Sequence, residues 1–216
     1  MKYIVRLSLM MIVIVLVSAC TSTNKVLFSD DFSGPNGNWD KYTDENMTTT
    51  YYENAYRILV NLQNYDAWAN PDDLSFTDVQ VEVDATKNGG PDTNDYGIIC
   101  RYSGLDSYYY GAIASDGYYG IYKKTAEGGK QLGTGEEQFS DKITTGATTN
   151  HIRFDCVGST LTLYANGTMI DQQTDSSYKE GNVGLIAGTY DEGGTDILFD
   201  NFIVYQPKAV QQQSGN

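Results

Sequence analysis

The sequence predicts an all-β fold, a sandwich or jelly roll of two antiparallel sheets with about a dozen strands. Apolar and polar residues alternate with a period of two in one segment after another, which is typical of half-buried strands. Turn dipeptides interrupt these segments at intervals of roughly 8–12 residues. After residue 25, no window has the apolar period of an amphipathic helix.

Residues 1–19 differ from the rest of the chain and predict a signal peptide. Lys2 and Arg6 precede an apolar run at residues 7–16. This run is shorter than the ~20 residues that a membrane-spanning helix needs. A positive start followed by a short apolar run is the pattern of an export signal that is removed from the mature protein.

The end of this run resembles a bacterial lipobox, because small residues precede a cysteine in Val17-Ser18-Ala19-Cys20. We therefore expect Cys20 to carry a diacylglycerol and an amide-linked acyl chain such as palmitate, which together attach a protein stably to a lipid bilayer. Residues 20–25 would be a short tether. The protein would then be exported and anchored to the outside of the cytoplasmic membrane or to the outer membrane. A secretory signal cleaved after Ala19, or an uncleaved anchor, is the alternative.

The charge balance excludes several classes of function. The chain has 14 basic and 28 acidic residues, a formal net charge of −14. Such a chain repels nucleic acids and anionic lipid headgroups, so no nucleic-acid partner is expected. His151 is the single histidine, which excludes zinc sites with two imidazoles and any Ser-His triad built on another histidine.

The alternation locates individual strands. Residues 79–85 place valines on one face and acidic or amide side chains on the other, and residues 151–156 and 160–165 repeat this pattern. Asn166-Gly167 then fits a type I′ hairpin turn, in which both central residues need a positive φ. We expect a hairpin at this point.

Two further turns divide the chain in the same way. Asp116-Gly117 separates residues 108–115 from residues 118–124, and a third turn falls at residues 157–159. Each predicts that the strands on its two sides are antiparallel neighbours.

The two ends of the body have related patterns. Residues 27–32 open it and residues 197–205 close it, and we expect these two strands to pair. The predicted domain therefore covers residues 26–206. The glutamine-rich residues 207–216 are expected to be a flexible C-terminal tail.

These segments together resemble the concanavalin-like, or laminin-G-like, jelly-roll domains of bacterial secreted proteins. The resemblance covers about residues 26–206 and implies a sandwich whose concave face holds a sugar in many relatives. Those relatives include lectins, carbohydrate-binding modules, glycan hydrolases and a keto-disaccharide hydrolase-like group. The segments that carry it are residues 27–32 with Trp39, residues 96–102 and 108–110, residues 161–167, and residues 183–185 with 199–202.

Aromatic residues are the strongest indication of a ligand site. Sugars stack their C–H faces on rings, and an arginine can hydrogen-bond their hydroxyls. Alternation predicts that Arg101, Tyr108 and Tyr110 face the concave surface together, with Tyr51, Tyr52, Tyr65 and Trp68 near its rim. The alternative is that each tyrosine is a good strand former whose ring is packed against its neighbours.

One acidic motif invites a catalytic interpretation. Glu82-Val83-Asp84 resembles the Glu-x-Asp-x-x-Glu strand of laminarinase-type hydrolases, but Lys87 occupies the position of the last glutamate. A strand with its apolar face buried places these acids in water without any catalytic role. We therefore assign no catalytic residue.

Acidic clusters raise the question of calcium, which takes six to eight oxygen ligands. No cluster has the spacing of a calcium-binding loop, and no cofactor is required. Asp31 and Asp200 are the tentative ligands of a structural calcium ion, because the terminal strands that carry them are expected to pair.

Two cysteines remain when Cys20 is lipidated. Cys100 and Cys156 both fall on apolar strand faces. An even pair in an exported protein is a candidate disulfide, and two buried free thiols are the alternative.

The sequence thus predicts a membrane-anchored cell-envelope lipoprotein with a non-catalytic, carbohydrate-binding domain. A glycoside hydrolase on the same fold is one alternative, and a structural or adhesive module is another. Paired acids ~5–9 Å apart on the concave face would favour the hydrolase. A tyrosine-lined groove without them would favour glycan binding, and a filled face would favour the structural module.

Overall fold

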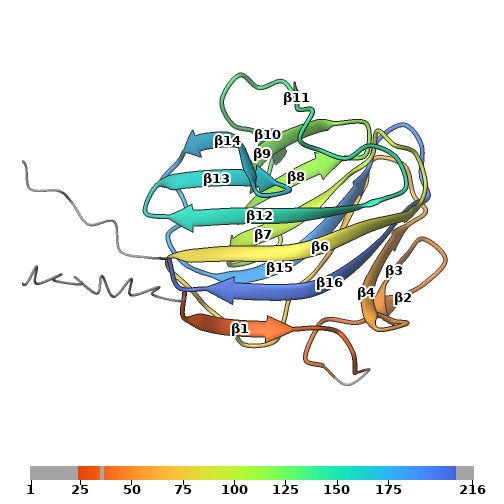
Figure 1. Cartoon of the computed structure of the whole chain (residues 1–216), viewed down its shortest axis with the longest axis horizontal. Coiled ribbons are helices and arrows are strands. Elements are labelled where there is room, and N and C mark those ends of the chain that lie inside the picture. The colour runs from red at the N-terminus through yellow and green to blue at the C-terminus, as the bar shows by residue number, and fades with distance from the viewer. Residues whose placement is uncertain (1–23, 35–36, 208–216) are drawn as a thin grey trace, which may run out of the picture.

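The computed structural model describes residues 24–34 and 37–207, which form sixteen strands in two antiparallel sheets (Figure 1). These residues contain no helix, so none of them forms a helix long and apolar enough to cross a membrane. The predicted all-β sandwich is therefore confirmed. Cys20 and the predicted signal peptide lie outside the described residues.

The nine-stranded sheet contains both ends of the domain. Its order is β14 (Thr168–Thr174), β13 (Thr160–Ala165), β12 (Thr149–Val157), β6 (Val79–Gly89), β16 (Thr195–Tyr205), β4 (Ala55–Val60), β3 (Met47–Tyr52) and β2 (Tyr42–Thr43), with β1 (Val26–Asp30) paired to β16. The β1–β16 pairing confirms that the terminal strands lie side by side. Lys25 also accepts a backbone hydrogen bond from Gln206.

The seven-stranded sheet carries the aromatic residues singled out by the sequence. Its order is β10 (Gly128–Gln131), β9 (Tyr118–Thr125), β8 (Tyr108–Ala114), β7 (Asp95–Tyr102), β15 (Asn182–Thr189) and β5 (Tyr65–Ala69), with β11 (Gln138–Phe139) paired to β9.

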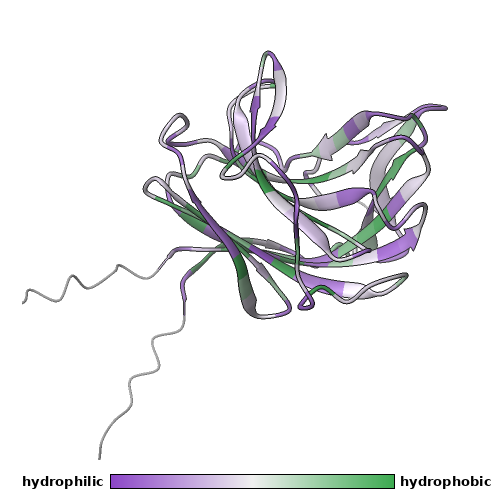
Figure 2. Ribbon diagram, turned by 90° about the horizontal axis from the view of Figure 1, so that it is seen from above, coloured by the Kyte–Doolittle hydropathy of each residue, from purple (hydrophilic) through white to green (hydrophobic). Residues whose placement is uncertain are grey.

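The main core lies between the two sheets. Val81 and Val83 of β6 and Phe154 of β12 are fully buried there, while the residues that alternate with them face outward. Burial of this apolar surface is the dominant favourable contribution to folding. Figure 2 shows the hydrophobic residues concentrated along the strands that face each other.

A disulfide joins the two sheets across this core. Cys100 of β7 is bonded to Cys156 of β12, and their Cα atoms are 6.7 Å apart. Both residues are fully buried. Of the two alternatives that the sequence left open, the structure shows the disulfide.

The predicted turns form hairpins. Asn166 and Gly167 have φ values of 50° and 81°, as a type I′ turn requires, and they join β13 to β14. At Asp116-Gly117, between β8 and β9, only Gly117 has a positive φ, at 100°. That hairpin is confirmed, but its turn needs one left-handed residue rather than two.

Candidate functional site

The outer face of the seven-stranded sheet carries a second apolar layer, separate from the main core. Tyr108 and Tyr110 of β8 point to this outer side while Ile113 points inward, as the alternation predicted. We call the aromatic face the set formed by Trp68, Tyr102, Tyr108, Tyr110 and Tyr122. Its rings are in contact: Tyr110 stacks on Tyr122 with centroids 4.7 Å apart, and Tyr108 lies 6.1 Å from Trp68.

Tyr108 and Tyr110 are packed rather than open, which corrects the expectation that they form an accessible sugar surface. Tyr108 is 0% exposed and Tyr110 is 7% exposed. The reason is that large side chains on adjacent strands cover one another, and burial raises the pKa of both phenols. The hydroxyl of Tyr108 has no hydrogen-bond partner in the described structure.

Arg101 does not lie on the aromatic face, so its predicted role there is wrong. The pairing of β7 with β15 shifts register between Asn182 and Gly184, and Arg101 has a φ of 54°. This bulge ends the alternation of β7 and turns the side chain away. The guanidinium, 1% exposed, donates to the carbonyls of Thr77 and Tyr178 and to Asp78.

The residues expected at the rim divide between the two sheets. Trp68 belongs to the aromatic face, and Tyr65 lies exposed at the start of the same strand. Tyr51 packs against Phe32 instead, and the guanidinium of Arg57 lies over the Tyr52 ring. Both of these tyrosines are on β3, in the other sheet.

Carboxylates converge beside the aromatic face. A Cβ atom added to Gly188 would lie 2.4 Å from Oδ1 of Asp95 and 2.9 Å from Oδ1 of Asp66, so the two carboxylates meet above this glycine. Burial, with the nearby charges of Asp66 and Glu137, raises the pKa of Asp95 to about 7. Asp66 is paired with Lys124, whose ammonium lies 3.3 Å away.

Two tyrosine hydroxyls connect these acids to a loop. Tyr190 donates to Oε1 of Glu137 at 2.7 Å and lies 3.3 Å from Oδ2 of Asp95. Tyr122 of the aromatic face donates to the same Glu137 oxygen at 3.0 Å. In the sequence, Asp95 is only one member of an acidic segment. Its meeting with Glu137 and Tyr190 could not be predicted, because the three residues come from distant segments.

A hollow of about 500 Å³ opens at this end of the aromatic face, and we call it the acidic hollow. Two half-exposed rings line it, Tyr118 at 43% exposure and Tyr190 at 39%. The other lining residues are Thr93, Asp116, Glu137, Asp191 and Glu192. The hollow thus combines accessible rings with carboxylates, which the buried part of the aromatic face does not offer.

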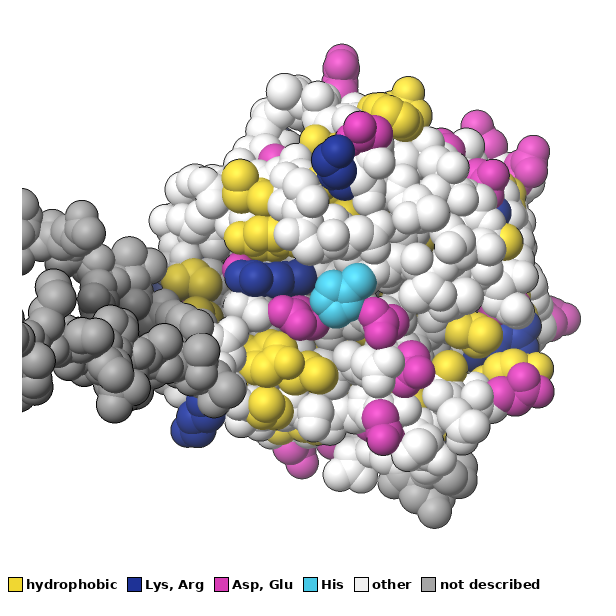
Figure 3. Space-filling model, viewed as in Figure 1, with side chains coloured by type: hydrophobic (Ala, Val, Ile, Leu, Met, Phe, Trp, Pro, Cys, Tyr) yellow, Lys and Arg dark blue, Asp and Glu magenta, His cyan; other side chains and the backbone are white. Residues whose placement is uncertain are grey.

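The opposite face of the molecule is a surface of paired charges. His151 lies between two acids of β6, with its Nδ1 2.7 Å from Asp84 and its Nε2 3.6 Å from Glu82 (Figure 3). Hydrogen bonds to Glu82 and Asp84 raise the pKa of His151 to about 9. Glu82 and Asp84 therefore act as ion-pair partners on a solvated face, and Lys87 is paired with Asp92.

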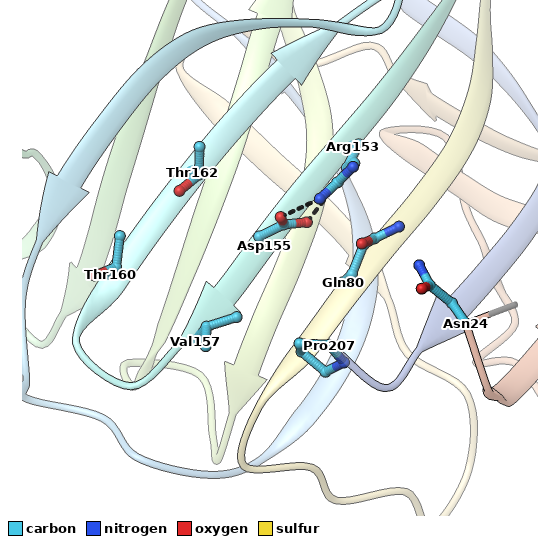
Figure 4. Close-up of a pocket in the computed structure, with 8 residues that line it drawn as sticks. All are labelled: Asn24, Gln80, Arg153, Asp155, Val157, Thr160, Thr162 and Pro207. Atoms are coloured by element: carbon cyan, nitrogen blue, oxygen red, sulfur yellow. Dashed lines mark hydrogen bonds and ion pairs between the residues drawn. The ribbon is translucent and has the colours of Figure 1, made fainter. Parts of the chain in front are cut away.

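A second hollow, of about 460 Å³, lies on this opposite face (Figure 4). Arg153 makes two hydrogen bonds to Asp155, at 2.8 and 2.6 Å, and its guanidinium lies 4.3 Å from the Tyr164 ring centroid. The remaining lining residues are Asn24, Gln80, Val157, Thr160, Thr162 and Pro207. Its charged groups already satisfy each other, in contrast to those of the acidic hollow.

The predicted calcium ligands lie apart from these hollows. The Asp31 carboxylate accepts hydrogen bonds from the backbone and hydroxyl of Ser33, and Asp200 is opposite Asp84 in the sheet. Among the described residues, no group of three or more acidic, histidine or cysteine side chains is arranged to hold a metal ion. Calcium at Asp31 and Asp200 stays a prediction.

The fold is a two-sheet jelly-roll sandwich, and solved structures of carbohydrate-binding modules and glycoside hydrolases share this fold. The chain is similar to the carbohydrate-binding module CBM66 of Bacillus subtilis, with 15% identity, a TM-score of 0.62, and coverage of 79% of this chain and 96% of that one. It is also similar to a protein of unknown function with a galectin-like fold from Bacillus subtilis, with 9% identity, a TM-score of 0.61, and coverage of 85% of this chain and 97% of that one.

A third similar structure is a Bacteroides ovatus GH16 protein from a mixed-linkage glucan locus, with 11% identity, a TM-score of 0.57, and coverage of 83% and 100%. Neither a protein-family model nor a curated protein matches the sequence. At these identities, the solved structures establish the shared fold and leave the ligand to be argued from this chain's own residues.

Proposed function

We propose that this protein is a lipid-anchored glycan-binding protein of the cell envelope, and that the acidic hollow at the end of its aromatic face is the binding site. The observation that carries the proposal is the pair of half-exposed rings, Tyr118 and Tyr190, beside carboxylates in one hollow. Rings stack on the C–H faces of sugars, and carboxylates accept hydrogen bonds from sugar hydroxyls. The carbohydrate-binding module among the structural neighbours supports the same class of ligand.

The position of the hollow suits an anchored protein. β16 begins at Thr195, close to the hollow, and ends at Tyr205, which is paired with Val26 near the tether (Figure 1). A strand rises about 3.3 Å per residue, so the length of β16 separates the two ends by roughly 30 Å. With the lipid on Cys20, the hollow would face away from the bilayer and toward glycans outside it.

Anchoring is tested by blocking lipoprotein processing. Globomycin, or the substitution Cys20→Ala, is expected to leave an unprocessed precursor, because the processing enzymes require the lipidated cysteine. A Cys20→Ala protein that is still matured and still sediments with membranes would overturn the anchor.

Glycan binding is tested on a glycan array with the purified protein. The substitution Tyr118→Ala is expected to weaken binding about five- to tenfold, since one stacked ring contributes on the order of 1 kcal/mol. Tyr42→Ala is the matched control, because Tyr42 is also half-exposed but lies on β2 in the other sheet. No binding to any glycan, or equal losses in both variants, would contradict the proposal.

A glycoside hydrolase, such as a keto-disaccharide hydrolase-like enzyme, is the second candidate, and the meeting of Asp66 and Asp95 favours it. The Oδ1 atoms of Asp66 and Asp95 lie 2.9 and 2.4 Å from one point above Gly188, so they are no farther apart than the ~5–5.5 Å carboxyl separation of retaining enzymes. Asp95, whose pKa is raised to about 7, would be the acid, and Asp66 the nucleophile. Release of free sugar by the wild type, lost on Asp95→Asn, would establish this activity.

The third alternative, a structural module, is supported by the packing of Tyr108 and Tyr110. A filled aromatic face contributes to stability whether or not a ligand binds beside it. For this reason we place the ligand in the hollow, where rings are accessible, and not on the packed rings of Tyr108 and Tyr110.

A further inference from the structure

The acidic hollow has a charge that its own residues do not neutralise. Four of its lining side chains are carboxylates, those of Asp116, Glu137, Asp191 and Glu192, and no described residue that lines it is basic. Glu137 accepts two tyrosine hydroxyls, whereas the carboxylates of Asp191 and Glu192 have no partner in the described structure.

The surroundings add to this negative potential. Asp95 lies behind Tyr190, and Asp66 lies beside Asp95. The ammonium of Lys124 is paired with Asp66. In the hollow of Figure 4, by contrast, Arg153 balances Asp155. Of the two hollows, therefore, only the acidic one presents a net charge to a ligand.

We propose that the acidic hollow binds a cationic glycan, one that carries free amino groups, as in oligosaccharides of glucosamine. This inference rests on the proposed function and specifies its ligand. Tyr118 and Tyr190 would stack on the sugar rings, and the unpaired carboxylates of Asp191 and Glu192 would pair with ammonium groups. The same carboxylates would repel uronates and sulfated sugars, which gives the site selectivity as well as affinity.

The volume of the hollow is compatible with such a ligand. About 500 Å³ falls within the ~300–1,000 Å³ that is usual for small-molecule sites in proteins. Most side chains that line the hollow are exposed to solvent, so the further sugars of a longer oligosaccharide can extend from the hollow into solvent. Because the carboxylates are exposed, salt screens their attraction to the ammonium groups of the sugar.

The test compares three tetrasaccharides by calorimetry with the full chain in detergent at low salt. The probes are β-1,4-linked glucosamine, its fully N-acetylated counterpart, and a galacturonate tetrasaccharide. We expect the amino form to bind at least tenfold more tightly than the acetylated one, and the galacturonate to show no binding. Added salt should weaken binding of the amino form and leave the acetylated form unchanged.

Substitutions distinguish attraction by the carboxylates of the hollow from attraction by the net negative charge of the whole chain. The double variant Asp191→Asn, Glu192→Gln should lower the preference for the amino form about tenfold, while Tyr118→Ala should weaken both forms. Glu180→Gln, which removes an exposed acid elsewhere, is the matched control and should change neither. A preference that survives the double variant would overturn the proposal, because it would come from the net charge of the whole chain.

Other outcomes distinguish this inference from the proposed function. Equal binding of the amino and acetylated forms, or binding of galacturonate, would overturn the cationic ligand and leave glycan binding intact. The cationic ligand would also be overturned if none of the three probes bound while a neutral glycan bound on the array and lost affinity on Tyr118→Ala. Failure of every glycan would overturn both.

Discussion

Two neighbouring tyrosines of β8 differ in the partners of their hydroxyls. Tyr109 points into the core, where its hydroxyl donates to Asp175 at 2.5 Å and accepts from the backbone N–H of Tyr178 at 3.0 Å. Tyr108 points to the aromatic face, and its buried hydroxyl has no partner. We expect Tyr109→Phe to lower the free energy of unfolding by about 1–3 kcal/mol, because it removes both hydrogen bonds and leaves the backbone N–H of Tyr178 without this acceptor. Tyr108→Phe should leave stability unchanged or raise it.

Urea denaturation of the two variants measures this difference, and each serves as the control of the other. Equal losses would show that the Tyr108 hydroxyl has a partner, such as ordered water. Tyr108→Ala is expected to lower the free energy of unfolding by about 3–5 kcal/mol, because it removes a fully buried ring.

His151 makes the stability depend on pH. Its pKa is about 9 in the folded protein and 6.5 when unperturbed, so the protonated ring stabilises the fold. This stabilisation is complete below pH 6.5 and is lost as the pH rises through about 9. We therefore expect the melting temperature of wild type to exceed that of His151→Gln near neutral pH, and the difference to disappear at about pH 10. A constant difference across this range would contradict the ion pairs with Glu82 and Asp84.

At the level of elements, the disulfide is the covalent link between the sheets. Cys100 and Cys156 are separated by 56 residues. Closing a loop of this length lowers the conformational entropy of the unfolded chain, which stabilises the folded state by about 4 kcal/mol. We expect the double variant Cys100→Ala, Cys156→Ala to lose about 2–4 kcal/mol in the free energy of unfolding. Stability equal to that of oxidised wild type in chemical denaturation would contradict this, and wild type under reducing conditions is the control that should lose a similar amount.

Alternation was sufficient to predict several elements. It located β6, β12 and the hairpin of β13 and β14, and it placed Tyr108 and Tyr110 on one face, because each depends on neighbouring residues alone. It could not show the bulge at Arg101, which depends on how β7 pairs with β15. Nor could it show that the tyrosine rings would be packed.

The acidic hollow could not be predicted from the sequence for a related reason. Its residues follow the ends of β6, β8 and β15 and precede β11, so their meeting depends on the order of strands in the sheet. From the sequence, acidic clusters raised only the question of calcium, and none had the spacing of a calcium-binding loop. The structure places two residues of such segments, Thr93 and Asp191, beside exposed tyrosines.

On the scale of the whole molecule, the two outer faces have different surfaces and the two ends have different environments. The nine-stranded sheet presents paired charges such as His151 with Asp84, and the seven-stranded sheet presents the aromatic face with unpaired acids at its end. The β1–β16 pair lies at the end of the domain next to the proposed tether, roughly the length of β16 away from the acidic hollow. This polarity agrees with a binding site carried away from a membrane.

The most direct measurement is an amide chemical-shift titration of the isotopically labelled protein with the glycan that binds most tightly on the array. The account predicts shifts that saturate and cluster around Thr93, Asp116 and Tyr190, at the acidic hollow. Shifts around Arg153 and Thr160 instead, on the other sheet and beside the ends of the domain, would show that the site lies elsewhere and would contradict the account.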